Sequence, residues 1–316
     1  PSLSCRNVFL ENWNSEVMMV RISNYLKHWE RSASPRQFSG YESMGATQQL
    51  VDAFRMKDGT AITPDKESGY SKANYSDPKS GWVFAPAGTR NMFVNREPRF
   101  YAWVCYDGGE YSSFIADGSP LILEARNSQK HGYNPDRYNR DNNATGYFSK
   151  KRIQPNFQWR SQDNGNNYAH TPLAVIRLAE LYLNLAECHA ALNSKQDVLD
   201  NLNIVRNRAG IPDLELSDIN SDMSLMDWVR SERYAELWFE GHRYFDARRW
   251  TIAPEVFKAG VREGLNAIAK KDPSFREFNQ RVKVDQPFMW NNKMYLLPIN
   301  DSEIYSNPQL VQSPEY

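Results

Sequence analysis

The chain has 316 residues, enough for one large domain or two ordinary ones with a substantial core. Its 38 lysines and arginines balance its 38 aspartates and glutamates, so charge gives no reason to bind nucleic acid or an anionic membrane. No apolar run approaches the roughly 18 residues that span a bilayer, and the opening PSLSCRNVFL lacks the features of a signal peptide. Cys5, Cys105 and Cys188 lie far apart and form neither a disulfide framework nor a metal motif.

The chain up to about residue 98 predicts more loops than regular elements. Residues 14–28 have a pattern that fits a strand or a short helix, and the pattern does not decide between the two. Residues 30–98 are polar and are punctuated by proline and glycine, as long surface loops are. Within them, residues 47–56 predict a short helix that leads into a turn.

Two short strands are expected in the next segment. Residues 100–106 (FYAWVCY) are rich in β-forming side chains and are followed by an Asp-Gly-Gly turn at 107–109. Residues 121–125 are interpreted as a companion strand. The tract 126–170 is polar and lacks strong periodicity, which is typical of functional or mobile segments. We therefore expect residues 1–170 to form a loop-rich region with short strands that faces the ligand.

Residues 171–316 predict a helical core instead. A helix is expected from 171 to 193, and it is apolar nearly all round, which indicates burial on several sides. A second helix, 196–209, ends at Gly210, with Pro212 close behind as a stop signal. This hairpin has the length of one tetratricopeptide unit, and about three such units are normally needed for a stable stack. We therefore expect further helices outside this chain.

The stretch from Trp228 to Trp250 predicts one helix that combines aromatic bulk with charge. At about 100° per residue, apolar and ionic side chains share a face, namely Leu225, Trp228, Glu232, Ala235, Glu236, Phe239, Arg243, Asp246 and Trp250. Buried charges must be paired, because an isolated buried charge is very unfavourable. Since the 171–209 hairpin carries complementary charges, we predict a structural ion-pair network. Its members are Glu180, Glu187, Arg206, Glu236, Glu240, Arg243 and Asp246.

Glu236 and Glu240 also offer a catalytic alternative, because carboxylates one helical turn apart suit acid–base chemistry or glycoside hydrolysis. The arginines around them favour the structural interpretation. The five histidines are scattered without metal-binding spacing. Nucleophile-elbow, P-loop and dinucleotide-binding motifs do not occur, so the sequence predicts no metal, no cofactor and no catalytic residue.

Aromatic side chains in polar, turn-rich sequence are the stronger signal for ligand binding. Aromatic faces stack on the apolar faces of sugar rings, while neighbouring polar groups bond to the hydroxyls. Each ring has the alternative role of anchoring a loop to the body of the protein. The candidate ligand-binding residues are Trp29, Tyr41, Tyr70, Tyr75, Trp82 and Arg90.

Seven separated motifs occur in an order that indicates a family. They are LVDAFRMKDG (50–59), NREPRFYAWVCYDG (95–108), TGYFSKK (145–151), LAVIRLAELYLNLAECHAALN (173–193), LNIVRNRAGIP (202–212), SERYAELWFEGHRYFDARRW (231–250) and MYLLPINDSEIYSNPQLVQSPEY (294–316). Any one motif is weak, but seven in order are very specific. On these motifs the chain resembles the C-terminal part of the SusD/RagB family, which are outer-membrane nutrient-binding lipoproteins of Bacteroidetes.

The resemblance implies a mainly α fold, in which a tetratricopeptide-type helical scaffold carries a loop-rich region with small β-strands. It also implies a non-catalytic, cell-surface protein that captures glycans for a TonB-dependent SusC-like transporter, as in starch utilisation systems. The family's N-terminal helical half and its lipidated cysteine have no counterpart in this sequence. We therefore expect a piece of a longer protein, which meets the membrane only through that lipid anchor. Because the family's ligand-contacting aromatics are poorly fixed in sequence, the six candidate residues rest on region and not on motif.

Two other functions stay open at this point. A helical-repeat adaptor would bind the transporter or a peptide ligand without any affinity for glycans. A glycoside hydrolase would use Glu236 and Glu240, and it ranks last. The sequence does not distinguish starch, mucin glycans, plant glycans or peptide as the ligand.

Overall fold

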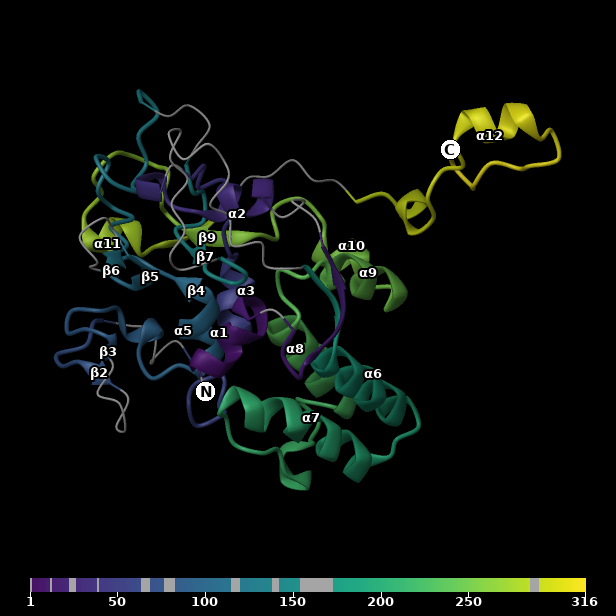
Figure 1. The fold of residues 1–316 in the computed structure, drawn as a ribbon, viewed down its shortest axis with the longest axis horizontal. Coiled ribbons are helices and arrows are strands. Elements are labelled where there is room, and N and C mark those ends of the chain that lie inside the picture. Colours follow the sequence, from purple (N-terminus) through teal and green to yellow (C-terminus); the bar gives the residue numbers. More distant parts are fainter. Residues whose placement is uncertain are drawn as a thin grey trace.

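The computed structural model describes residues 2–11, 13–22, 27–38, 40–63, 69–76, 83–114, 120–137, 142–153, 173–284 and 290–316. Within these ranges the fold is mainly helical with small two-stranded sheets, as predicted (Figure 1). The α-helices are α1 (Ser2–Leu10), α2 (Lys27–Ala33), α3 (Gln48–Ala53), α5 (Pro98–Trp103), α6 (Leu178–Ala191), α7 (Lys195–Ala209), α8 (Leu225–Glu236), α9 (His242–Arg249), α10 (Ala253–Val256), α11 (Phe275–Phe278) and α12 (Asp301–Ser306). None of these helices has the length and apolar character needed to cross a bilayer.

Each small sheet is an antiparallel pair of strands. The pairs are β1 (Val17–Arg21) with β8 (Leu173–Arg177), β2 (Tyr75–Ser76) with β3 (Val83–Ala85), β4 (Val104–Cys105) with β7 (Phe148–Ser149), β5 (Glu110–Phe114) with β6 (Pro120–Ile122), and β9 (Glu263–Leu265) with β10 (Arg281–Lys283). Most of the strands are too short to form a layer of their own. They act as cross-links between loop segments.

The larger hydrophobic core is built mainly from aromatic side chains. Phe93 and Tyr106 stack with their ring centroids 4.3 Å apart, and Phe54 meets Trp103 edge-on at 6.4 Å. Buried residues from the C-terminal part join the same core, among them Ala235, Leu265, Ala267 and Phe278. This core therefore draws on both sides of the expected boundary at residue 170, and that division remains a prediction.

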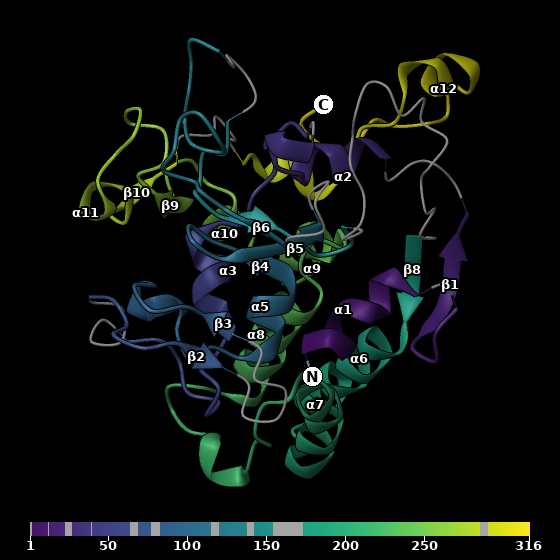
Figure 2. The ribbon, with the colours of Figure 1, turned by 60° about the vertical axis from the view of Figure 1, so that its left-hand side comes forward.

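A smaller core lies between α6, α7 and α8. Leu183 of α6, Leu202 of α7 and Val229 of α8 are all fully buried in it. Figure 2 shows α6 and α7 side by side as the predicted hairpin. Helix α7 ends at Ala209, and the next residue, Gly210, has a left-handed φ of 77° and donates its N–H to the carbonyls of Arg206 and Asn207. The hairpin and its glycine stop are confirmed.

The expected helix start at residue 171 is wrong. Residues 171–172 lie outside the described ranges, and Leu173–Arg177 form strand β8, so the helix begins only at Leu178. β-Branched Val175 and Ile176 suit an extended chain, and the segment pairs with β1, where Ile176 lies opposite Met19. The same pairing shows that the undecided segment 14–28 contains a strand at Val17–Arg21.

The strand expected at 100–106 is also mostly wrong. Residues Pro98–Trp103 form helix α5, and only Val104 and Cys105 are extended. Proline at the first helical position is preorganised for a helix, and Phe100 to Trp103 are buried. Burial on a helix therefore outweighs the β-propensity of these aromatic side chains. The predicted turn at 107–109 is present, and β6 overlaps the expected strand 121–125.

The single helix expected from Trp228 to Trp250 is two helices, α8 and α9. In the segment that joins the two helices, Phe239 and Gly241 have left-handed φ values of 65° and 90°. These backbone conformations interrupt the α-helix. The Nζ atom of Lys151 donates to the carbonyl oxygens of Glu236 and Trp238, at 2.7 Å each. This distant ammonium satisfies carbonyls that a continuing helix would have bonded itself.

Candidate functional site

Glu236 lies at the centre of a buried ion-pair network. Its carboxylate is fully buried and contacts Arg208, Arg177 (2.7 Å) and Arg99 (2.9 Å). Burial by itself would raise the pKa of Glu236, but these three guanidinium groups outweigh it and hold the pKa below its usual range. The side chain is therefore a charged structural centre.

Neighbouring carboxylates extend the network through shared arginines. Glu240 accepts from Arg177 at 2.7 Å and from Lys151 at 2.6 Å. Glu232 pairs with Arg99 at 2.5 Å and with Arg206 at 3.3 Å. Burial would raise the pKa of Glu240, whereas Arg177 and Lys151 keep it low. Strand β8, helix α5 and helix α7 thus all deliver cations to the carboxylates of α8 and of the turn after it.

A second group of ion pairs joins α9 to the hairpin. Asp246 contacts Arg233 at 3.1 Å and Arg249 at 2.8 Å, and Glu187 contacts Arg249. Glu187 also accepts from the indole N–H of Trp250 at 2.7 Å. These contacts are more exposed than those of Glu236, since Arg249 is 43% exposed.

Two predicted members of the network lie apart from its centre. The carboxylate of Glu180 is 3.8 Å from Nε2 of His242. Arg243 was expected to pair with a carboxylate, but its guanidinium lies over the ring of Tyr234, 4.3 Å from the centroid. A guanidinium is stabilised there by the electron-rich face of the ring.

The structure describes five of the six candidate ligand residues, and it brings only two of them, Tyr70 and Arg90, together. Trp29 packs on Phe239, with ring centroids 5.2 Å apart, and so anchors α2 to the turn between α8 and α9. Tyr41 is half-buried beneath the guanidinium of Arg31, which lies 4.4 Å from its ring centroid. Trp82 lies outside the described residues.

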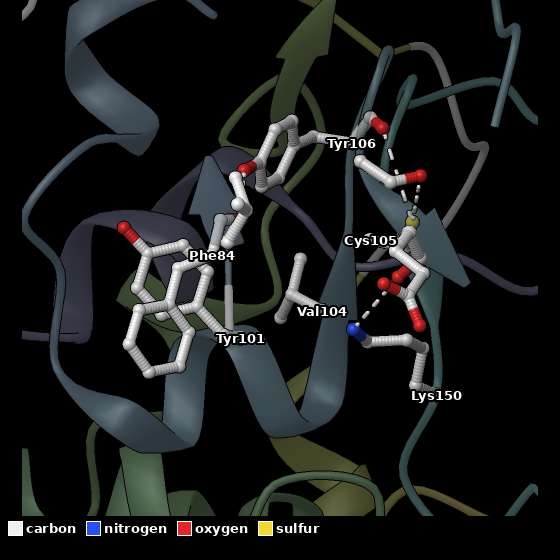
Figure 3. A pocket seen from close by; sticks show the side chains of 9 residues that line it. Phe84, Tyr101, Val104, Cys105, Tyr106 and Lys150 are labelled. Carbon is white, nitrogen blue, oxygen red and sulfur yellow. Dashed lines mark hydrogen bonds between the residues drawn. The ribbon is translucent and has the colours of Figure 1, made fainter. Parts of the chain in front are cut away.

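Tyr75 belongs to an aromatic cluster around a small cavity. Its ring lies 5.5 Å from that of Phe84 and 6.0 Å from that of Tyr101. Figure 3 shows Phe84 and Tyr101 stacked on one side of this cavity, and Lys150 on the other, donating to the carbonyl of Glu110 at 3.1 Å. The cavity volume is about 10 Å³, which is room for one water molecule and not for a sugar.

Tyr70 and Arg90 do come together. Their backbones form an antiparallel bridge, and 62% of Tyr70 is exposed. The Tyr70 ring meets the ring of Phe275 edge-on, with centroids 6.2 Å apart. Phe275 in turn lies beneath the guanidinium of Arg126, 5.7 Å from its ring centroid. Tyr70 therefore contacts Phe275, and Phe275 contacts Arg126, which lines a neighbouring hollow.

This polar hollow is open to solvent and has a volume of about 500 Å³. Small-molecule sites typically measure about 300–1,000 Å³, so the hollow has the size of a ligand site. It lies between the turn after β4, the segment after β6 and the turn before α11. Its lining consists of Asp107, Gly108, Leu123, Glu124, Arg126, Asn127, Asp272 and Pro273.

The turn at 107–109 shapes one wall of the hollow. Gly108 adopts a left-handed φ of 84°, and its N–H donates to the carbonyl of Leu123 at 2.7 Å. Asp107 then accepts from the backbone N–H of Arg126 at 3.3 Å and from its Nε at 2.6 Å. The carboxylate thereby orients the Arg126 side chain toward the Phe275 ring.

Asp272 fixes the opposite wall. Its carboxylate accepts from the N–H of Ser128 at 2.7 Å and from the Ser128 hydroxyl at 2.8 Å, which lowers its pKa. Asp272 itself has a left-handed φ of 45°, which aspartate tolerates better than most residues. Glu124, nearby, accepts from Asn127 at 2.9 Å, and this bond lowers its pKa. Both carboxylates are therefore ionised at neutral pH.

The sequence reasoning missed Phe275 and the acids of this hollow. Phe275 stands in the polar sequence KKDPSFRE, so the criterion that selected Tyr70 applies to it equally. Asp107 was recognised only as part of a turn. Among the described residues, no three His, Cys, Asp or Glu side chains come together as ligands for a metal ion.

Comparison with known proteins identifies the family. The family model described as the SusD family matches residues 10–316. The chain belongs to the SusD family. The predicted resemblance is thereby confirmed, together with the mainly helical fold class.

Two solved structures and one curated relative are similar to this chain over part of their own length. BT4246 is 41% identical with a TM-score of 0.80, over 96% of this chain and 51% of that chain. A SusD-like protein from Bacteroides fragilis is 26% identical with a TM-score of 0.68, over 96% of this chain and 54% of that one. SusD-like protein P25 of Formosa agariphila is 33% identical over 153 residues, which are 48% of this chain and 25% of that protein. The SusD-family chain thus spans about half of the solved relatives and a quarter of P25.

Proposed function

We propose that this chain is the ligand-contacting part of a cell-surface protein that binds glycans without cleaving them. In this proposal the full-length protein is lipid-anchored in the outer membrane and delivers its ligand to a TonB-dependent transporter of the SusC type. Membership of the SusD family supports the proposal.

The observation that carries the proposal is the arrangement of aromatic rings beside the polar hollow. Phe275 and exposed Tyr70 meet edge-on, and Arg126 connects the Phe275 ring to the lining of the hollow. A sugar stacked on Phe275 would place its hydroxyls near Asp107, Asn127 and Asp272. Carboxylate and amide groups accept or donate the hydrogen bonds that hydroxyls require.

The surroundings of Glu236 and Glu240 argue against glycoside hydrolysis. A glycosidase needs two carboxyl groups that flank the substrate, one of them with a raised pKa. Glu236 is fully buried, Glu240 is 4% exposed, and both are engaged by cations that lower their pKa. Neither carboxylate is accessible to a sugar.

Isothermal titration of the chain against a panel of oligosaccharides tests the proposal. We expect binding to at least one oligosaccharide, and we expect Phe275→Ala to weaken it about tenfold or more, which corresponds to about 1.4 kcal/mol. Tyr305→Ala is the matched control, because Tyr305 is 85% exposed on α12, a helix that stands apart from β6 and α11 (Figure 1). Equal affinities for the wild type and Phe275→Ala would remove the hollow from the binding site.

The adaptor alternative predicts a different pattern. An adaptor would co-purify with a SusC-like transporter and show no affinity for any oligosaccharide on the panel. Binding that survives Phe275→Ala but is lost in Trp29→Ala would move the site to the α2 side, where Trp29 packs on Phe239.

A further inference from the structure

The hollow beside Phe275 has an unbalanced charge. Its lining contains three carboxylates, Asp107, Glu124 and Asp272, and one cation, Arg126, so the lining residues carry a formal charge of −2. Lys130, which contacts Glu124, reduces this excess to −1. Hydrogen bonds from Ser128 lower the pKa of Asp272, and a hydrogen bond from Asn127 lowers that of Glu124. The negative charge therefore persists at neutral pH.

Four cations on the lining segments are paired with carboxylates. Arg126 is held by Asp107 at 2.6 Å, and Lys130 contacts Glu124 at 3.3 Å. Lys270 contacts Glu277 at 2.8 Å, and Lys271 contacts Asp136. An anionic ligand in the hollow would have to compete with a carboxylate for each of these four cations.

The carboxylates remain open to uncharged donors. An ionised carboxylate has about four lone-pair sites. Asp272 is exposed and receives its two hydrogen bonds from a single residue, Ser128, so further lone pairs face solvent. Sugar hydroxyls donate to such oxygens, whereas a uronate or sulfate group offers only more negative charge at neutral pH.

We propose that this hollow selects uncharged glycans over glycans that carry uronate or sulfate groups. The inference rests on the proposed glycan-binding function and adds the ligand's charge class to it. Asp107, Glu124 and Asp272 are the residues that determine this selectivity, and Phe275 supplies the stacking surface common to both classes of sugar.

Matched titrations test the selectivity. Neutral hexose oligosaccharides are compared with uronate oligosaccharides of the same length and linkage, at low and at physiological salt. We expect the neutral member of a pair to bind at least about tenfold more tightly, which corresponds to about 1.4 kcal/mol. We also expect added salt to reduce the difference in affinity between neutral and uronate oligosaccharides, because salt screens the repulsion between exposed charges.

A double variant, Glu124→Gln with Asp272→Asn, removes two of the charges and keeps the side-chain shapes. It should raise the ratio of uronate affinity to neutral affinity about tenfold, whereas Glu303→Gln on α12 removes one exposed charge elsewhere and should leave that ratio unchanged. Uronate binding as tight as neutral binding in the wild type would overturn the selectivity while leaving the proposed function standing. Failure of both classes to bind would overturn the two together.

Discussion

Replacing Glu236 by glutamine removes one negative charge from the centre of the buried network and nearly preserves the side-chain shape. The carboxylate contacts three guanidinium groups, those of Arg99, Arg177 and Arg208, and is fully buried. Removing one partner of a buried ion pair costs about 3–5 kcal/mol, because the remaining charges are left uncompensated. Native domains are typically stable by about 5–15 kcal/mol, so the Glu236→Gln variant should lose a large share of its free energy of unfolding.

Urea unfolding followed by circular dichroism measures this loss directly. Asp136→Asn is the matched control, because its carboxylate is 76% exposed and pairs with Lys271 on the surface. Exposed pairs contribute about 0–1 kcal/mol, so this control should remain close to the wild type. If Glu236→Gln also lies within about 1 kcal/mol of the wild type, the network does not hold the fold together as argued.

Acid titration of the same variant gives a second measurement. The folded-state pKa values of Glu236 and Glu240 lie below their usual range, because the surrounding cations outweigh the effect of burial. Their contribution to stability is therefore complete above the unfolded pKa of about 4.3 and is lost as the pH falls below it. The wild type should lose stability more steeply below about pH 4.3 than Glu236→Gln, which lacks one of these groups.

Three further predictions concern single side chains. Burial, helped by the charge of Arg36, lowers the pKa of His131 to about 4, so stability should fall as the pH drops from about 6.5 to 4. Thermal melts across that range should show the decline, and His131→Asn should flatten it. Gly241→Ala places an alanine at a φ of 90°, and no atom lies within 4 Å of the new Cβ. The free energy of unfolding, measured by urea titration, should therefore fall by about 1–2 kcal/mol from backbone strain alone. Lys151→Met removes the ammonium that bonds to the carbonyls of the turn after α8, so the free energy of unfolding should fall. A decrease of less than about 1 kcal/mol in the same urea titration would contradict that role.

Local patterns predicted the helical hairpin well. The apolar period of residues 196–209 and the stop at Gly210 are encoded within one stretch of chain, and the structure has both. The high cost of burying an unpaired charge also predicted that Glu236 must have cationic partners. It did not name Arg99 or Lys151 as partners, because they come from 137 and 85 residues away.

Two of the errors in the fold also come from contacts between distant segments. The break after Glu236 depends on Lys151, and the strand at 173–177 depends on pairing with Val17–Arg21. The hollow combines the turn at 107–109 with Asp272 from the far end of the chain. Such contacts follow from the tertiary fold, and neither periodicity nor propensity reports them.

Hydrogen–deuterium exchange with and without a bound oligosaccharide tests the central claim most directly. If the hollow is the glycan site, a ligand chosen by titration should slow exchange at residues 107–109, 123–130 and 271–276. Exchange in α12, which carries none of the proposed contacts, should not change. Protection confined to residues 27–44 around Trp29 and Tyr41, with the hollow unaffected, would contradict the claim.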